Sequence, residues 1–328
     1  MSKKINKIAV LTSGGDSPGM NAAVRSVVRT CAYHNIECLG VYRGYEGLIE
    51  ADFEPMNARS VRDIINRGGT ILKSARSMRF KTPEGRKQAY DNLVKEGVDA
   101  MVLIGGDGTF TGGLVFNKEY DFPVIGIPGT IDNDIAGTDF TLGYDTALNT
   151  AVEAIDKIRD TASSHNRLFF IEVMGRDVGH IALNAGIGAG AEQIMIPEES
   201  IGIARLLESL ERSRKSGKLS SIVIVAEGDK TGKNVFELKD YIDDLNEGYD
   251  VRVMVLGHMQ RGGSPTCFDR VLASRMGVKA VESLMEGKSN FMVGTVHDKM
   301  TLCPIEDALH GESKINKELI RVSEIMTT

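Results

Sequence analysis

The sequence contains no apolar run that approaches the ~20 residues needed to cross a bilayer as a helix. Its amino terminus, MSKKINKIAVLTSGGD, lacks the long apolar segment of a secretory signal. Basic residues are not in excess either: the formal net charge is −6, which argues against a general nucleic-acid binder. We therefore expect a cytoplasmic protein whose partners include neither a membrane nor nucleic acid.

Cysteine is scarce and scattered. The four cysteines are Cys31, Cys38, Cys267 and Cys303, and no two of them have a CxxC spacing. A disulfide framework or a metal cluster is therefore not expected. Small buried apolar side chains are the better interpretation of these residues.

The Walker A pattern GxxxxGK[ST] is absent as well, which excludes the usual P-loop route to a nucleotide. Glycine, by contrast, is abundant: it makes up 36 of the 328 residues, and most of it follows short apolar runs. In open α/β sheets, the loops that leave the carboxyl ends of buried strands build the ligand crevice. Many strand ends of this chain are thus expected to face ligands.

Two such strand ends carry polar side chains that suggest chemistry. Ala100 to Thr109 reads AMVLIGGDGT, and Val124 to Asp134 reads VIGIPGTIDND. Glycines let the backbone approach a phosphate, and Asp107 among them is placed to hold phosphate-bound Mg²⁺. On an extended backbone, Asp132 and Asp134 would point to one side, as suits a hydroxyl that must lose its proton. Taken alone, the DND tripeptide could instead be a turn whose side chains cap backbone amides.

The rest of the chain predicts an α/β alternation. A strand at 8–11 runs into the glycine-rich turn 12–19, and a helix at 20–33 follows, an arrangement that favours an anion at the helix amino terminus. Further strands are expected at 36–42, 168–174, 222–226 and 251–256, and further helices at 61–66, 84–96 and 145–160. Because the second half repeats the pattern, we expect two doubly wound, Rossmann-like α/β domains with the active site in the cleft between them.

A phosphoryl-transfer site needs a nucleotide cradle, a metal holder, cations on the moving group and a base for the attacking hydroxyl. The predicted cradle consists of Gly15, Gly106, Gly108 and Thr109. Asp107 would hold Mg²⁺, and Asp132 would accept the proton. Arg76 and Arg176 would neutralise the phosphoryl group, although an exposed arginine is usually solvated surface. Thr130 would donate a hydrogen bond to the transferring group.

Further cations follow the strands of the second half. They are Arg167, Arg176, Arg252, His258 and Arg261, which we place at strand ends. This is more cationic charge than one triphosphate requires, so the second substrate is predicted to be a phosphate ester as well. Each arginine alone could equally be a surface ion pair, and His258 alone a structural histidine. Glu227 could accept hydrogen bonds from sugar hydroxyls.

The order strand, GGDGT, strand, PGTIDND resembles that of the bacterial-type ATP-dependent 6-phosphofructokinases. The resemblance covers nearly the whole chain, through LTSGGDSPGMNA, INRGGT, AIDKIRDTASSH, EVMGR, LGHMQRGGSP and ASRMG. It implies a glycolytic kinase that transfers the γ-phosphoryl group of ATP to the 1-hydroxyl of fructose 6-phosphate with Mg²⁺. It also implies a homotetramer in which Arg167 and Arg252 reach a neighbouring subunit's site.

The resemblance assigns further residues to ligands. The matching sugar-phosphate contacts are Thr130, Ile131, Asp132, Arg167, Met174, Gly175, Arg176, Glu227, Arg252, His258, Met259, Gln260 and Arg261. The matching nucleotide contacts are Gly15, Arg76, Ser77, Gly106, Asp107, Gly108 and Thr109. On this basis we expect residues 1–142 with 259–309 to bind nucleotide, and residues 143–258 with 310–328 to bind the sugar phosphate.

The family also has an effector site for ADP or phosphoenolpyruvate, and here the chain departs from the pattern. Arg25, Arg29, Arg159, Glu192 and Lys218 match it, but Ala58 and Ser216 stand where basic residues are usual. We therefore expect a weak effector response. Two alternative functions stay open: a pyrophosphate-dependent enzyme, in which an aspartate and a lysine are usual at the positions of Gly108 and Gly129, and a catalytically silent regulatory subunit.

Overall fold

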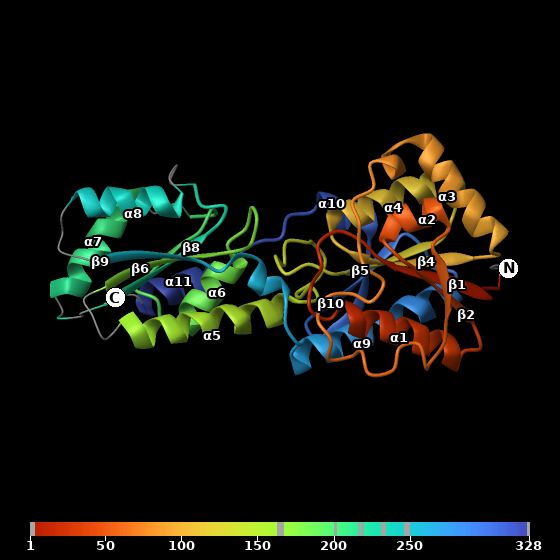
Figure 1. The fold of residues 1–328 in the computed structure, drawn as a ribbon, viewed down its shortest axis with the longest axis horizontal. Helices are drawn as coiled ribbons and strands as arrows, with labels where there is room; N and C mark the ends of the chain where they lie inside the picture. The colour runs from red at the N-terminus through yellow and green to blue at the C-terminus, as the bar shows by residue number, and fades with distance from the viewer. Residues whose placement is uncertain are drawn as a thin grey trace. The chain divides into compact units, whose positions relative to one another are not determined.

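The fold is that of a computed structural model, which describes residues 4–162, 167–199, 202–215, 217, 220–230, 234–245 and 250–326. The chain divides into two compact units. The first unit comprises Met1–Thr146 and Arg261–Ser313, and the second comprises Ala147–Gln260 and Lys314–Thr328. These divisions lie within a few residues of those expected from the sequence at 142, 258 and 309. Figure 1 labels the elements of both units.

A seven-stranded sheet forms the centre of the first unit, in the order β11-β10-β5-β4-β1-β2-β3. The strands are β1 (Lys7–Thr12), β2 (Glu37–Val41), β3 (Phe53–Met56), β4 (Ala100–Gly105), β5 (Val124–Pro128), β10 (Phe291–Val296) and β11 (Lys299–Pro304). The five inner strands are parallel, and the two edge strands are antiparallel to their neighbours. The inner strands are buried on both faces, which explains their nearly continuous apolar sequences.

Helices cover both faces of this sheet. They are α1 (Met20–Tyr33), α2 (Gly44–Glu50), η1 (Arg79–Lys81), α3 (Pro83–Lys95), α4 (Asp107–Tyr120), α9 (Cys267–Met285) and α10 (Ile305–His310). Ile8 and Val10 of β1 share a core cluster with residues of α1 and α9. Ala9 and Leu11, on the opposite face, pack with α2, α3 and α4. The alternation of side chains along β1 thus divides the core into two layers, as a doubly wound fold requires.

The second unit contains a four-stranded parallel sheet in the order β7-β8-β6-β9. Its strands are β6 (Arg167–Val173), β7 (Gln193–Met195), β8 (Ser221–Ala226) and β9 (Asp250–Val255). Its helices are α5 (Tyr144–Ala162, which starts in the first unit), α6 (His180–Gly188), α7 (Gly202–Lys215), α8 (Val235–Asp244), η2 (Gly257–Arg261, whose last residue is in the first unit) and α11 (Lys317–Met326).

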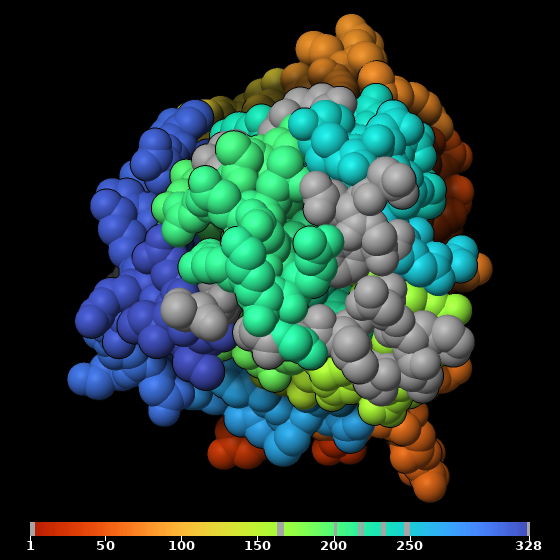
Figure 2. Space-filling model, turned by 90° about the vertical axis from the view of Figure 1, so that its left-hand side faces the viewer, coloured from red at the N-terminus to blue at the C-terminus, as the bar shows by residue number. Residues whose placement is uncertain are grey.

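Helices α7 and α8 share a core cluster with Leu168 and Phe170 of β6, so they cover one face of this sheet. Figure 2 shows α7 in green at the surface of this unit. Its exposed charged residues, among them Glu208, Glu211 and Arg212, face away from that core. The amphipathic pattern of α7 follows directly from this placement.

The expected strands at 36–42, 168–174, 222–226 and 251–256 are confirmed to within one residue at each end, as are the helices at 20–33 and 84–96. The helix expected at 61–66 is wrong, because these residues form turns. Asp63 has a left-handed φ of 56°, which breaks a segment too short to nucleate a helix. Val61 and Ile64 are nevertheless buried in the core.

The expectation for the cysteines holds for two of the four. Cys31 and Cys38 are buried, Cys303 is partly buried, and Cys267 is exposed at the first position of α9. Among the described residues, no helix has both the length and the apolar character needed to cross a membrane.

Candidate active site

Three glycine-rich turns meet at one edge of the first unit's sheet. They leave β1, β4 and β5, which are neighbouring parallel strands, so their carboxyl ends lie together. The backbone N–H of Ser13 donates to the carbonyl of Ile104 (3.0 Å), and that of Gly129 donates to the carbonyl of Gly105 (3.0 Å). These bonds continue the sheet beyond the strands and hold the three turns against one another.

The turn between β4 and α4 is built to receive an anion. Gly106 is the N-cap of α4 and provides no side-chain cap, so N–H groups of the helix amino terminus remain for a ligand. A Cβ on Gly108 would meet none of the described atoms within 4 Å, so the space beside it is open. A Cβ on Gly105 would lie 2.4 Å from the Ser13 carbonyl oxygen, so only glycine fits there.

Thr109 is a buried residue in the first turn of α4. Its Oγ1 is buried and has no hydrogen-bond partner in the described part of the chain. A buried hydroxyl in that state is costly unless a ligand completes it. The Thr109 carbonyl accepts a hydrogen bond from the hydroxyl of Tyr45 on α2, and burial raises the pKa of Tyr45, which keeps that donor protonated. Nothing in the local sequence around Tyr45 indicated this contact.

The turn after β1 lies beside the same threonine. A Cβ on Gly14, whose φ is +84°, would be 3.6 Å from Thr109 Oγ1. Next to it, a Cβ on Gly15 would be 2.8 Å from Nη1 of Arg261, and that nitrogen donates to the Asp16 carbonyl (3.4 Å). Arg261, which the sequence assigned to the sugar phosphate, thus lies against the first glycine turn.

The loop after β5 places Asp132 in a largely buried position, with 6% of its surface exposed. The Thr130 hydroxyl donates to Asp132 Oδ2 (3.4 Å) and accepts from the Asp132 backbone N–H (3.2 Å). Ile131, between them, is fully buried. The Thr130–Asp132 pair is therefore held as one unit with a defined orientation.

The extended backbone expected at residues 132–134 is wrong. Asn133 has a left-handed φ of 55°, so Asp132 and Asp134 do not alternate as on a strand. Asn133 Oδ1 accepts from the Thr141 backbone N–H (2.8 Å), and its Nδ2 donates to the Asp139 carbonyl (3.1 Å). For Asn133, the alternative interpretation of a side chain that caps a turn is the correct one.

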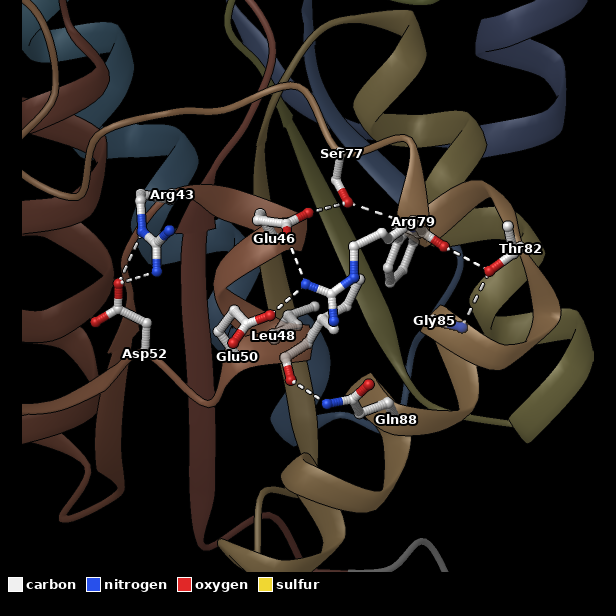
Figure 3. A network of polar contacts seen from close by, with 12 residues as sticks. Arg43, Glu46, Leu48, Glu50, Asp52, Ser77, Arg79, Thr82, Gly85 and Gln88 are labelled. Atoms are coloured by element: carbon white, nitrogen blue, oxygen red, sulfur yellow. Dashed lines mark hydrogen bonds and ion pairs between the residues drawn. The ribbon is translucent and has the colours of Figure 1, made fainter.

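Arg76 is exposed on the loop that follows β3. Its neighbour Ser77 forms hydrogen bonds within the protein. The Ser77 hydroxyl donates to Glu46 Oε2 (2.6 Å) and accepts from the Phe80 backbone N–H (3.1 Å). As Figure 3 shows, Arg79 also reaches Glu46 (2.8 Å) and Glu50 on α2.

The ring of Phe80 stacks on Tyr45, with 4.0 Å between the ring centroids. Because Tyr45 also donates to Thr109, the loop that carries Arg76 is connected through one side chain to the amino terminus of α4.

In the second unit, the structure brings Arg176 and Glu227 together at the carboxyl ends of β6 and β8. The Arg176 backbone N–H donates to Glu227 Oε1 (2.7 Å). Gly175 precedes it with φ +147°, and Met174 is partly buried at the end of the strand. Burial, aided by the charge of Glu227, raises the pKa of Glu172 on β6. Glu172 was not singled out from the sequence.

Arg167 and Arg252 do not lie at the carboxyl ends of the strands with Arg176. Arg167 lies at the amino end of its strand, and Arg252 lies within β9, so the strand-end placement expected for Arg252 is wrong. Arg167 is the first residue of β6, and Arg252 pairs in register with Phe169. Both arginines bind Asp250, at 3.0 Å and 2.9 Å, and they lower the pKa of its carboxyl group. A seven-residue strand spans roughly 20 Å, so within one chain Arg167 lies far from Arg176.

Four predicted contacts lie on η2, the fourth being Arg261, which is described above. His258 and Met259 are exposed, and Gln260 is buried and donates from Nε2 to the Gly257 carbonyl (3.1 Å).

The residues of the expected effector site fall in both units. Arg25 and Arg29 lie on α1, partly buried and exposed respectively. In the second unit, Arg159 donates to the Ala189 carbonyl (2.8 Å) and lies 3.5 Å from Glu192, which is buried. Ala58 and Arg59 lie in a turn, and Lys218 and Ser216 are outside the described residues.

The chain resembles a family model and several known proteins. The phosphofructokinase family model matches residues 7–284. The ATP-dependent 6-phosphofructokinase 2 of Bacteroides thetaiotaomicron is 51% identical over 96% of this chain and 96% of its own length. The ATP-dependent 6-phosphofructokinase 1 of Thermus thermophilus is 52% identical over 98% of this chain and 99% of its own length.

Solved structures show the same fold. The phosphofructokinase structure from Saccharomyces cerevisiae has a TM-score of 0.88 and 39% identity, and the match covers 99% of this chain and 47% of that one. A pyrophosphate-dependent phosphofructokinase from Marinobacter aquaeolei shares the fold, with a TM-score of 0.84 at 22% identity, over 96% of this chain and 86% of that one. By sequence and by fold, this chain belongs to the phosphofructokinase family.

Proposed function

We propose that the protein transfers the γ-phosphoryl group of ATP to the 1-hydroxyl of fructose 6-phosphate, giving fructose 1,6-bisphosphate and ADP. The observation that carries this proposal is the junction of the uncapped amino terminus of α4 with the Thr130–Asp132 loop on neighbouring strands. One side of that junction suits the phosphates of a donor, and the other side presents a carboxylate to an acceptor hydroxyl. Relatives about 51% identical carry the same activity in their names.

In this site, Asp132 accepts the proton of the sugar hydroxyl as it attacks phosphorus. Thr130 orients that carboxylate through the two contacts between them. The Thr109 hydroxyl, which lacks a partner among the described residues, donates to a nucleotide phosphate. Arg76 and Arg176 stabilise the negative charge of the transferring phosphoryl group.

Magnesium fits the first unit through Asp107. Among the described residues there is no group of three or more His, Cys, Asp or Glu side chains that could form a closed metal site. Mg²⁺ usually needs only one or two carboxylates, because substrate phosphates and water supply the other ligands. Asp107, in the first turn of α4 beside the open space at Gly108, meets that requirement. When bound, the ion neutralises charge on the donor phosphates.

ATP is favoured over pyrophosphate by two glycines. The open space beside Gly108 leaves room for the α-phosphate and nucleoside, which an aspartate there would crowd and repel. A Cβ on Gly129 would lie 3.0 Å from the Met20 side chain and 3.4 Å from that of Ile104. A lysine at 129 therefore fits only if these core side chains shift.

The second unit supplies the sugar-phosphate side, through Met174, Gly175, Arg176, Glu227, His258, Met259 and Gln260, with Arg261 and Ile131 from the first unit. The position of Arg167 and Arg252 at the other end of the sheet supports a shared site. We infer that they serve the site of a neighbouring subunit in a homotetramer. The expected location of the enzyme is the cytoplasm.

We also propose a pocket that binds ADP or phosphoenolpyruvate as an effector, to which the activity of the enzyme responds weakly. Arg159 already satisfies two backbone carbonyls and lies near Glu192. Because Ala58 lies in a turn, the neighbouring Arg59 can replace the missing charge only by a shift of the loop. Initial rates at sub-saturating fructose 6-phosphate test this proposal, and a strong response to micromolar effector would contradict it.

The coupled assay for fructose 1,6-bisphosphate with purified protein tests the function. We expect turnover with Mg·ATP and not with pyrophosphate. Turnover with pyrophosphate but not with Mg·ATP would show that pyrophosphate, and not ATP, is the phosphoryl donor. No turnover with either donor, in a folded protein that still binds ATP, would favour the silent regulatory subunit.

A further inference from the structure

Asp269 is a buried carboxylate that the roles above leave unused. It lies in the first turn of α9 and has no exposed surface. Its Oδ1 accepts a hydrogen bond from the Gly143 backbone N–H (2.9 Å). Its Oδ2 accepts from the Thr146 backbone N–H (2.9 Å) and from the Thr146 hydroxyl (2.5 Å).

These contacts hold the segment that supports the Asp132 loop. Immediately before Gly143, Leu142 donates its backbone N–H to the Pro128 carbonyl (2.9 Å). Thr141 donates its hydroxyl to the Thr130 carbonyl (2.6 Å). The position of Gly143 therefore constrains Pro128 through Leu142 and Thr130 through Thr141, with one hydrogen bond to each.

The turn after β1 packs against the same point. A Cβ on Gly19 would lie 3.7 Å from Cβ of Asp269, and one on Gly143 would lie 2.7 Å from Cβ of Ser17. Thr266, the N-cap of α9, donates its backbone N–H to Thr146 Oγ1 (3.0 Å). Asp269 thus lies where the first glycine turn, the loop after β5 and the start of α5 meet.

Only a carboxylate serves all three donors. Both of its oxygens accept, whereas an amide has one accepting oxygen and would turn its NH₂ toward a backbone N–H. The three donors are neutral, and burial raises the pKa of Asp269 to about 6 despite them. An ionised carboxylate at this position costs folding stability, as is common for groups that serve a site.

We propose that Asp269 is a positioning residue that holds the Thr130–Asp132 loop in its reactive geometry through Gly143 and Thr141. This role rests on the proposed phosphoryl transfer, because it assigns the loop a reactive geometry.

The test is the variant Asp269→Asn, measured by kinetics, thermal unfolding and amide hydrogen exchange. We expect kcat to fall about tenfold to a hundredfold, since small misplacements of reacting groups have effects of that size. KM for ATP stays within about threefold, because the nucleotide contacts lie on other segments. Tm changes little, because the lost acceptor is offset by removal of a buried charge, whereas a merely structural residue would lower Tm and spare kcat.

Ser283→Ala is the matched control. Ser283 is buried on the same helix, and its hydroxyl has no hydrogen-bond partner in the described part of the chain. Should Asp269→Asn fail to fold, Thr146→Val removes one of the three donors to Asp269, together with the acceptor of the Thr266 backbone N–H. Its kcat should fall several-fold, and Thr146→Ser, which keeps the hydroxyl, should restore it.

Hydrogen exchange tests the role of Asp269 independently of the proposed phosphoryl transfer. Faster exchange across residues 129–146 in the Asp269→Asn or Thr146→Val variant, but not in Ser283→Ala, supports positioning whether or not the wild type uses ATP. Wild-type protein without turnover would overturn the function alone. Unchanged exchange in that segment, or a kcat within twofold of wild type in both variants, would overturn the role of Asp269.

Discussion

The two groups of strand ends differ in how the chain assembles them. In the first unit, the turns after β1, β4 and β5 gather Gly15, Asp107 and Asp132 at one edge of the sheet. In the second unit, Arg176 and Glu227 meet at the carboxyl edge, while Arg167 and Arg252 lie toward the other edge with Asp250. A short motif directly after a strand predicts its place well, whereas a charged residue inside a strand can belong to either edge.

The largest effect is expected in the first unit. Asp132→Asn preserves the shape of the side chain but removes the proton acceptor, so kcat should fall by roughly 10²–10⁴-fold. Sugar-phosphate binding should change far less, because an amide keeps one oxygen for hydrogen bonds. Steady-state kinetics with both substrates varied provides the measurement.

Asp121→Asn is the control for this variant. Asp121 is exposed after α4 with a left-handed φ of 51°, which asparagine tolerates. A kcat for Asp132→Asn within a few-fold of the control would make Asp132 a structural residue.

The second unit's separated arginines predict complementation between subunits. Arg252→Ala should lower kcat/KM for fructose 6-phosphate by roughly one to two orders of magnitude. This is the effect expected from the loss of one charge-assisted hydrogen bond. Mixed oligomers of Arg252→Ala and Asp132→Asn chains should regain activity, because some sites then combine an intact base with an intact arginine.

Arg275→Ala is the matched control, since Arg275 forms an exposed ion pair with Asp298 in the first unit. It should not complement Asp132→Asn beyond its own activity. Light scattering during turnover gives the oligomeric state, and a fully active monomer would contradict the shared site.

Gly108 sharpens the assignment of the donor. Gly108→Ala places a methyl group in open space and should raise KM for ATP only a few-fold. Gly108→Asp adds a negative charge next to the phosphates and should raise it about tenfold or more. If both variants bind ATP as the wild type does, the nucleotide does not lie beside this glycine.

The smallest effect concerns pH and stability. The folded-state pKa of Asp269 is raised to about 6 from an ordinary value of 3.8. The folded state therefore holds this proton more tightly than the unfolded state does between these values. As pH rises from about 4 through about 6, the contribution of Asp269 to the free energy of unfolding should fall, by roughly 1–3 kcal/mol.

Denaturant unfolding of the wild type and of Asp269→Asn across this pH range measures the difference. Parallel curves for the two proteins would show that Asp269 does not titrate in this range.

The sequence by itself determined the α/β class, most strands and helices, and the turns after β1, β4 and β5. Those signals are local. A buried strand is recognised as a continuous apolar run, and a position where the backbone must closely approach another segment is recognised by its glycine. The GGDGT and PGTIDND segments needed no long-range contact to be recognised.

Only the tertiary structure decided the rest. Asn133 adopts a left-handed backbone conformation, in which its side-chain oxygen accepts a hydrogen bond from the backbone N–H of Thr141, eight residues away. The tertiary structure brought Tyr45 to Thr109, and Asp269 to Gly143, across 64 and 126 residues of sequence. It also brought Arg167 to Asp250, 83 residues later in the chain, which neither composition nor spacing reveals. Such contacts depend on which strands become neighbours, and that choice is made by packing of the whole core.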